Sequence, residues 1–468
     1  MNWNSLNQTR SHLRRTTTGA GAATTRLARS LGGLRLRRCD VRVTKTNCLS
    51  SLRGFSLACP NMTATTGGSV AAQPAGNNNK VRAVPLNERS GGGKNNKKRK
   101  VSATAIPHKY LKQEIPVIPK EESLATPERI AASWDFFRKM GSPKYHVAPM
   151  VDQSELPFRM LCRKYGATCA YTPMLHGRLF VEGEKYREEH FTTCPEDRPL
   201  LAQFCANDPQ VLLQAAKYVE KDCDGVDLNF GCPQRIAKRG NYGAFLMEDM
   251  DTAKSLVTIL AKNLSIPVTC KIRVFPQDEP NGKEKTLQYA KMLQDAGCML
   301  LAVHGRTRDQ KNTKEFRANW NIIKAVKEHL DIPVLANGDI RHLNDANKCI
   351  EFTGCEGVLS ADPLLKNPTL FSTEKSEFGE PDCPWQNCLI LQEYLDLCET
   401  YPTPQRMIRA HVHKLLGNYF SVFPDVRQRM NNEVSTIQLY RDVAEELIGL
   451  IKEHGLEANK PEEVKATA

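Results

Sequence analysis

The stretch Gly225-Val226-Asp227-Leu228-Asn229-Phe230-Gly231-Cys232-Pro233-Gln234 decides how the rest of the chain is interpreted. It begins as a short apolar strand, which cannot continue past Pro233. Cys232 is therefore presented on a loop at the carboxyl end of a strand, where parallel α/β folds carry their functional groups. A buried structural cysteine is the alternative interpretation. Two observations oppose this alternative. Asn229 lies on the same face as the end of the strand, and the following loop, 235–243, is basic and contains glycine.

Short apolar runs of this kind recur along the chain, each followed by a loop and a helical stretch. They fall at residues 145–150, 169–174, 200–205, 225–230, 267–273, 300–305, 332–338 and 357–361. Eight strands that alternate with helices are the pattern of a (β/α)8 TIM barrel. A doubly wound open sheet is the competing architecture, but it usually carries an early GxGxxG fingerprint, which this sequence lacks. We therefore predict an α/β protein built on a TIM barrel.

The composition changes along the chain and predicts five segments. Helical spacing replaces the strand pattern at residues 385–399, 404–420, 425–431 and 435–454. The predicted segments are a disordered basic tail at 1–107, a linker and lead-in helix at 108–144, a catalytic TIM barrel at 145–380, an all-helical domain at 381–456 and a disordered C-terminal tail at 457–468.

The net charge of +13 is unevenly distributed. Residues 1–144 hold 26 Lys and Arg against 7 Asp and Glu, whereas residues 145–468 hold 39 against 45. A nucleic-acid site on the body must therefore be a local basic patch. One candidate is a helix face that carries Arg406 and Arg409. This face is either a solvated charged surface or a phosphate-binding one.

The N-terminal tail contains two conflicting targeting signals. Eight Arg and no acid precede Asp40, as in an organellar transit peptide, whereas Lys97-Lys98-Arg99-Lys100-Val101 is typical of nuclear import signals. We expect a cytoplasmic or nuclear protein, with a mitochondrial or plastid location as the alternative. A tail that only adds nonspecific affinity for RNA is a third interpretation. Sixteen scattered Cys without a CxxC pair indicate reduced thiols, and no apolar run is long enough to span a membrane.

Polar residues stand at the carboxyl ends of the predicted strands, which in a barrel converge on one cavity. The polar ones are Gln203, Asn229, Cys232, Lys271, Arg273, His304, Arg306, Asn337, Asp339 and Ser360, and Pro149, Met150, Gly338 and Ala361 stand beside them. An amide, a lysine and a histidine in an apolar pocket suit a flat polar heterocycle such as a flavin. Gln203 can pair with its carbonyl and N–H groups, and Lys271 can stabilise negative charge on the reduced ring. The backbone N–H groups of Asn337-Gly338 suit its phosphate, and we predict no metal site.

These motifs, in this order, resemble the tRNA-dihydrouridine synthase family. The matching segments are Ala148-Pro149-Met150, Pro157-Phe158-Arg159, Asp227-Leu228-Asn229-Phe230-Gly231-Cys232-Pro233, Gly243-Ala244-Phe245-Leu246, Lys271-Ile272-Arg273, His304-Gly305-Arg306-Thr307 and Ala336-Asn337-Gly338-Asp339-Ile340. Further segments resemble the eukaryotic branch that modifies uridines 16 and 17 of the tRNA D-loop. These are Thr172-Pro173-Met174, Leu179-Phe180-Val181, Asn367-Pro368-Thr369-Leu370-Phe371, Arg409-Ala410-His411 and Lys414-Leu415.

The resemblance implies an FMN-dependent oxidoreductase that uses NADPH to saturate the C5=C6 bond of uracil in tRNA, with a hydride delivered to C6 and a proton from Cys232 to C5. FMN contacts are then expected from Pro149, Met150, Gln203, Lys271, His304, Asn337, Gly338, Asp339, Ser360 and Ala361. Substrate contacts are expected from Asn229, Arg273, Arg306, Arg235, Lys238, Arg239, Arg406 and Arg409. Many relatives have Gly-Arg after the eighth strand, whereas this chain has Ser360-Ala361-Asp362, and we expect the Asp362 carboxylate to point away from the FMN phosphate.

Two other functions stay open at the level of the sequence. An FMN barrel oxidoreductase of another kind would reduce a free small molecule as fast as folded tRNA. An RNA-binding module that has lost flavin would purify without colour. The expected partners are tRNA and NADPH, without a membrane or a metal. We expect a monomer, although no sequence feature bears on the oligomeric state.

Overall fold

The computed structural model describes residues 123–373 and 385–455, which belong to one compact unit. The predicted tails at 1–107 and 457–468, the two targeting signals and residues 108–122 of the predicted linker lie outside the described residues. The predicted lead-in helix is α1, Pro127–Lys139. Thr126 caps its N-terminus, because the threonine hydroxyl accepts a hydrogen bond from the backbone N–H of Arg129.

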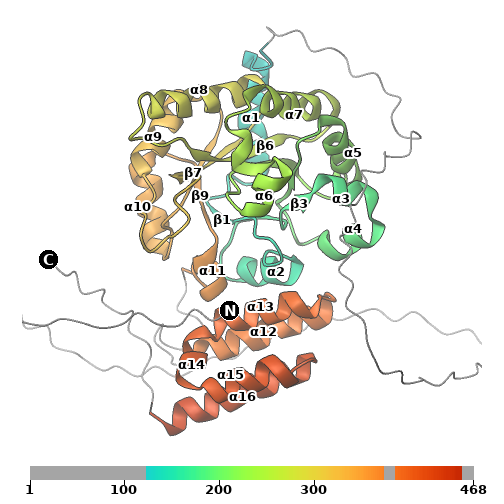
Figure 1. Cartoon of the computed structure of the whole chain (residues 1–468), viewed down its shortest axis with the longest axis vertical. Coiled ribbons are helices and arrows are strands. Elements are labelled where there is room, and N and C mark those ends of the chain that lie inside the picture. The colour runs from blue at the N-terminus through green and yellow to red at the C-terminus, as the bar shows by residue number, and fades with distance from the viewer. Residues whose placement is uncertain (1–122, 374–384, 456–468) are drawn as a thin grey trace, which may run out of the picture. The chain divides into compact units, whose positions relative to one another are not determined.

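Eight parallel strands form a closed barrel at the centre of Figure 1, as predicted. They are β1 (Tyr145–Val147), β2 (Cys169–Tyr171), β4 (Leu200–Cys205), β5 (Gly225–Phe230), β6 (Val268–Val274), β7 (Leu301–Thr307), β8 (Val334–Asn337) and β9 (Gly357–Ser360). Pairing of β1 with β9 and of β2 with β4 closes the ring. A two-residue strand, β3 (Leu175–His176), also pairs with β4 and was not predicted.

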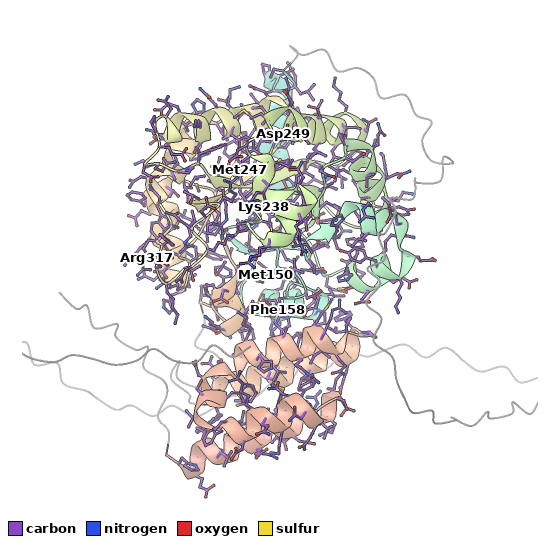
Figure 2. The ribbon with its side chains drawn as sticks, viewed as in Figure 1. Met150, Phe158, Lys238, Met247, Asp249 and Arg317 are labelled. Carbon is purple, nitrogen blue, oxygen red and sulfur yellow. The ribbon has the colours of Figure 1, made fainter. Side chains whose placement is uncertain are left out.

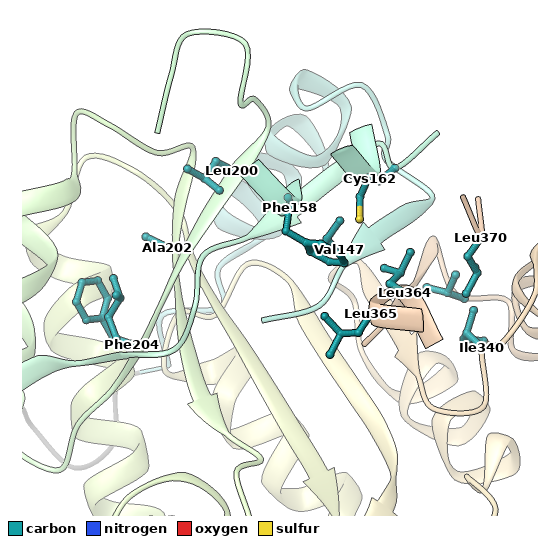
Figure 3. Close-up of a cluster of buried hydrophobic side chains, with 14 of the residues drawn as sticks. Val147, Phe158, Cys162, Leu200, Ala202, Phe204, Ile340, Leu364, Leu365 and Leu370 are labelled. Atoms are coloured by element: carbon teal, nitrogen blue, oxygen red, sulfur yellow. The ribbon is translucent and has the colours of Figure 1, made fainter. Parts of the chain in front are cut away.

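Helices surround the barrel in Figure 1. They are α2 (Leu156–Lys164), α3 (Gly177–Glu182), α4 (Glu184–His190), α5 (Pro209–Val219), α6 (Arg235–Gly240), the 3-10 helix η2 (Gly243–Leu246), α7 (Met250–Asn263), α8 (Gly282–Asp295), α9 (Trp320–His329), α10 (Leu343–Thr353) and α11 (Asp362–Lys366). An apolar layer fills the space between strands and helices. In Figure 3 it includes Val147 of β1, Phe158 and Cys162 of α2, and Leu364 and Leu365 of α11. The strands are mostly apolar because both of their faces are buried.

The amino end of the barrel is closed by α1. Phe136, Phe137 and Met140 belong to the same buried cluster as Leu201 of β4 and Leu335 of β8. The ring of Phe136 approaches within 3.5 Å of the position that a Cβ would occupy at the first residue of β5. A side chain can therefore meet a ligand in the barrel only at the carboxyl end, which is the end where barrels of this kind carry their functional sites.

Five helices form the predicted C-terminal helical domain. They are α12 (Gln386–Thr400), α13 (Gln405–Leu415), α14 (Gly417–Val422), α15 (Pro424–Glu433) and α16 (Ile437–Glu453). A buried carboxylate of the barrel, Glu155, joins the two parts. It accepts hydrogen bonds from the hydroxyl of Tyr394 at 2.7 Å and from Nε2 of His411 at 3.0 Å. The ring of Phe158 stacks on His411 with centroids 4.4 Å apart. Among the described helices, none is long and apolar enough to cross a membrane.

Candidate active site

Strand register brings the predicted polar residues to one end of the barrel. Gln203 lies opposite Asp227, and Asn229 lies opposite Lys271. In the same way, His304 on β7 lies between Arg273 on β6 and Asn337 on β8. The helix α6 lies in front of these strands in Figure 1, so it stands over the end of the barrel that carries them.

A chain of hydrogen bonds connects the Cys232 loop to a buried carboxylate. The backbone N–H of Cys232 donates to Oδ1 of Asn229 at 2.8 Å, and Nδ2 of Asn229 donates to Oε1 of Gln203 at 2.8 Å. Nε2 of Gln203 then donates to Oδ2 of Asp227 at 2.7 Å, and the hydroxyl of Thr269 donates to Oδ1 of the same carboxylate at 2.6 Å. Burial raises the pKa of Asp227 to about 6, against these two hydrogen bonds.

Lys271 is a half-buried cation whose hydrogen-bond partner is an amide. Its Nζ donates to Oδ1 of Asn337 at 2.9 Å, and Nδ2 of Asn337 donates to the carbonyl of Leu359 at 2.9 Å. Among the described residues, no carboxylate forms an ion pair with Lys271. Burial, and then the charge of Arg273, lower the pKa of Lys271 to about 8. An ammonium group has three N–H donors, so this lysine has donors left for an anionic ligand.

His304 is held as a neutral imidazole beside an arginine. Burial, followed by the charges of Arg273, Lys271 and Arg306, lowers its pKa well below the ordinary value. NH1 of Arg306 lies 3.0 Å from Nε2 of His304. A guanidinium can only donate, so Nε2 must accept and Nδ1 carries the proton. Arg306 is itself fixed by Asp339, whose Oδ1 lies 2.6 Å from NH2 of the arginine.

Arg273 connects two loops of the site. Its Nε donates to the carbonyl of Gly231 at 3.0 Å, and its NH1 donates to the carbonyl of Thr307 at 2.6 Å. Burial, and then the charge of Arg306, lower its pKa to about 10. Arg273 was predicted to contact the substrate, but its Nε group is used to hold the loop that contains Cys232.

The Cys232 loop also depends on a glycine. Gly243 has a φ of +67°, and a Cβ there would lie 2.8 Å from the carbonyl oxygen of Cys232. The same carbonyl accepts a hydrogen bond from the N–H of Ala244 at 3.1 Å. Cys232 is half-buried. The basic residues of α6 are exposed, and Figure 2 marks Lys238 among them; the three are Arg235, Lys238 and Arg239.

The remaining predicted flavin contacts occupy loops at the same end. Met150, marked in Figure 2, follows β1 directly after Pro149, and its backbone N–H donates to the hydroxyl of Ser154 at 3.0 Å. Gly338 has a φ of +112°, which an L side chain rarely adopts. The hydroxyl of Ser360 donates to the carbonyl of Ile340 at 2.8 Å.

Asp362, which follows Ala361 at the start of α11, is held by two lysines. Its carboxylate contacts Nζ of Lys414 at 2.6 Å and Nζ of Lys366 at 2.7 Å. Burial acts to raise its pKa, but hydrogen bonds from Lys366 and Lys414 outweigh it and lower the pKa. The expectation that this carboxylate points away from a phosphate stays a prediction.

Arg406 and Arg409 are engaged within the protein. Arg406 forms ion pairs with Asp152, at 3.3 Å, and with Glu189. Arg409 donates to the carbonyl of Val434 at 2.8 Å. Both guanidinium groups of α13 therefore already have partners within the protein. Their assignment as tRNA contacts stays a prediction.

The supporting residues Asp227, Thr269, Glu155 and His411 were not predicted as site residues. Asp227 could have been found, because a carboxylate between apolar residues of a strand must be buried and must find hydrogen-bond donors. The pair of Glu155 and His411 could not, because its members are 256 residues apart. Among the described residues, no group of His, Cys, Asp and Glu could hold a metal ion.

A family model and several named proteins match this chain. The model of the dihydrouridine synthase (Dus) family matches residues 146–450. A Rattus norvegicus protein named as a tRNA-dihydrouridine(16/17) synthase-like protein is 48% identical over 295 residues, covering 63% of this chain and 64% of that protein. The Saccharomyces cerevisiae tRNA-dihydrouridine(16/17) synthase is 45% identical over 302 residues, covering 63% of this chain and 70% of the yeast protein.

A Homo sapiens protein with a different named specificity is less similar. It is named as a tRNA-dihydrouridine(20a/20b) synthase-like protein, and it is 34% identical over 268 residues, covering 57% of this chain and 79% of that protein. The chain spans less than two thirds of the length of the rat relative.

Proposed function

Because the chain belongs to the dihydrouridine synthase family, we propose that it is a flavin-dependent oxidoreductase that reduces uridines of tRNA to dihydrouridine with NADPH. The observation that carries this proposal is the position of Cys232. Its thiol lies at the carboxyl end of a barrel strand, and Asn229 holds its backbone beside Gln203 and Lys271. An acid, an amide and an unneutralised cation thus surround one end of the barrel.

The donor set fits FMN. Lys271 is a half-buried cation that has no carboxylate partner among the described residues, so an anionic ring edge would complete its environment. Gln203 keeps one N–H and one lone pair for the ring edge after its bonds to Asp227 and Asn229. The chemistry that bound FMN would supply is transfer of a hydride from NADPH to C6 of the uracil. The predicted contacts of Pro149 and Met150 would complete the pocket.

The residues of the chain would provide the proton and the position of the base. Addition of a hydride at C6 creates electron density at C5, and the S–H group of Cys232 would donate a proton there. A positioned acid typically contributes about 10²- to 10⁴-fold to such a step. The base must leave the folded tRNA to reach the barrel, which costs a few kcal/mol and less in a loop whose bases are already unstacked.

We infer that uridines 16 and 17 are the substrates. The support is that the relatives named for positions 16 and 17 are 43–48% identical to this chain, whereas the human relative named for 20a and 20b is 34% identical. Mapping of dihydrouridine in an unmodified tRNA transcript after incubation with the enzyme tests this inference. Dihydrouridine at positions 20a and 20b but not at 16 and 17 would overturn it.

The first test of the activity is a pair of flavin half-reactions. The purified protein should carry FMN, and NADPH should bleach the flavin absorbance under anaerobic conditions. Unmodified tRNA should then restore it, whereas free UMP should not. A flavin that UMP reoxidises as quickly would indicate a small-molecule oxidoreductase, and a protein without flavin would indicate an RNA-binding module.

A further inference from the structure

Asp227 is a buried carboxylate that touches neither the proposed acid nor the loop that carries it. Its two oxygens accept hydrogen bonds from Thr269 on β6 and from Gln203 on β4. It shares a face of β5 with Asn229, because side chains two residues apart on a strand point the same way. Cys232 lies beyond Asn229, at the end of the hydrogen-bond chain.

The carboxylate at one end of this chain and the backbone N–H groups of Gly231 and Cys232 at the other, which both donate to Oδ1 of Asn229, require the same direction for every hydrogen bond between them. An ionised carboxylate can only accept, so Gln203 must turn its Nε2 towards Asp227 and its Oε1 towards Asn229. Asn229 must then turn its Nδ2 towards Gln203, which leaves its Oδ1 facing the backbone N–H of Cys232. If the Asn229 amide were turned over, its Nδ2–H group would face the backbone N–H of Cys232, and no hydrogen bond could form there.

We propose that Asp227 is the positioning residue of the site: its carboxylate sets the orientation of the Gln203 and Asn229 amides and thereby holds the backbone of Cys232. The hydrogen bonds point from the loop to the anion, and bonds that end on a charged acceptor are stronger than bonds between neutral groups. The same carboxylate fixes which atoms of Gln203 remain for a ligand. The importance of Cys232 as an acid rests on the proposed function, but the orientation argument does not.

The substitution Asp227→Asn tests the proposal because it keeps the shape of the side chain. The asparagine can present an N–H group to Gln203, in which case both amides turn over and the N–H of Cys232 loses its acceptor. Thr269→Val is the matched control: it removes the other hydrogen bond of the carboxylate and leaves the amide orientation unchanged.

The measurement is the rate at which iodoacetamide alkylates Cys232, mapped by mass spectrometry, relative to the rate for Cys194 in the same sample. These are the two half-exposed cysteines among the described residues, so Cys194 reports general loosening of the fold. For Asp227→Asn we expect the Cys232/Cys194 ratio to rise about fivefold, as for the loss of one hydrogen bond. For Thr269→Val the ratio should stay within about twofold.

Equal ratios in the wild type, in Asp227→Asn and in Gln203→Met would overturn the proposal, and so would an equal rise of the ratio in Asp227→Asn and in Thr269→Val. If Asp227→Asn does not fold, Gln203→Met replaces it, because this change removes the next link of the chain with little change in volume. Reoxidation of the reduced flavin by tRNA is measured in parallel. If tRNA does not reoxidise even the wild-type flavin, the proposed function fails, whereas the alkylation ratio still decides the role of Asp227.

Discussion

At the scale of the residue, replacement of Cys232, in the loop after β5, and replacement of Asp227, within β5, have different expected consequences. Replacement of Cys232 by Ala removes the proposed acid, but the Asn229 bond to its backbone N–H remains available. The variant should therefore retain FMN. Reoxidation of the reduced flavin by tRNA should slow by about 10²- to 10⁴-fold. Stopped-flow absorbance measures this rate, and an unchanged rate would remove the thiol from the mechanism.

The buried carboxylate also makes the stability of the fold depend on pH. Burial raises the pKa of Asp227 from the ordinary 3.8 to about 6. A carboxyl group with a raised pKa binds its proton more tightly in the folded state, so its contribution to stability is present below pH 4 and is lost as the pH rises to about 6. Relative to Asp227→Asn, the wild-type free energy of unfolding should fall by roughly 2 kcal/mol across this window.

Urea denaturation of both proteins at several pH values measures this difference, in which the titrations of all other groups cancel. A difference that is independent of pH between 4 and 6 would contradict a raised pKa for Asp227. A difference that grows with pH would mean that the hydrogen bonds from Thr269 and Gln203 outweigh burial.

At the scale of the element, the conformation of the segment from β5 to η2 depends on Gly243. Gly243→Ala would place a Cβ 2.8 Å from the carbonyl oxygen of Cys232, at a φ of +67° that disfavours alanine. We expect a destabilisation of about 1–3 kcal/mol, as for other strained backbone sites, together with slower reoxidation of the flavin by tRNA.

Gly449→Ala is the matched control for this prediction. Gly449 is exposed within α16, and a Cβ there would meet nothing within 4 Å. Alanine should therefore stabilise this helix by about 1 kcal/mol and leave the flavin kinetics unchanged. Thermal unfolding with stopped-flow absorbance separates the two variants. A Gly243→Ala protein with wild-type kinetics would show that the loop tolerates the displacement.

The elements that the sequence predicts well are those with a strong local signal. The strands β4 and β5 begin and end at the predicted residues, because runs of apolar residues are bounded there by turn residues. The two-residue strand β3 escapes prediction because its pairing with Phe204 and Cys205 is a tertiary contact. In the site, residue types at strand ends identify Gln203 and Lys271 as candidates. Their orientation depends on neighbours from other strands, which no local pattern contains.

At the scale of the whole molecule, the barrel and the helical domain are joined by a buried polar contact. Glu155→Ala would leave Nε2 of His411 and the hydroxyl of Tyr394 buried without their acceptor. Loss of one member of a buried pair typically costs about 3 kcal/mol or more. Lys164→Ala, which removes an exposed ion pair with Glu393 in the same interface, should cost less than about 1 kcal/mol. Urea denaturation measures both, and equal losses would contradict the central role of Glu155.

Some cations among the described residues are already paired with carboxylates. This pairing decides which of them can contribute to the proposed binding of tRNA. Among the described residues, Arg235, Lys238 and Arg239 of α6 are exposed and form no ion pair, whereas Arg406 is paired with Asp152 and Glu189. A cation that is already neutralised releases few additional counterions when it meets a phosphate. The α6 residues should therefore account for more of the salt dependence of tRNA binding, and they follow closely after Cys232, the proposed acid.

Two variants test whether α6 contributes more than Arg406 to the salt dependence of tRNA binding. They are the triple change Arg235→Gln, Lys238→Gln and Arg239→Gln, and the single change Arg406→Gln. The triple variant should retain FMN, and its plot of log affinity for tRNA against log salt should be shallower by about 2, because each phosphate contact contributes about 0.7–0.9 to the slope. Arg406→Gln should change that slope by less than about 0.5. If Arg406→Gln alone flattens the slope as much as the triple variant does, the ion pairs with Asp152 and Glu189 must open when tRNA binds, and the helical domain would then be the main phosphate-binding surface.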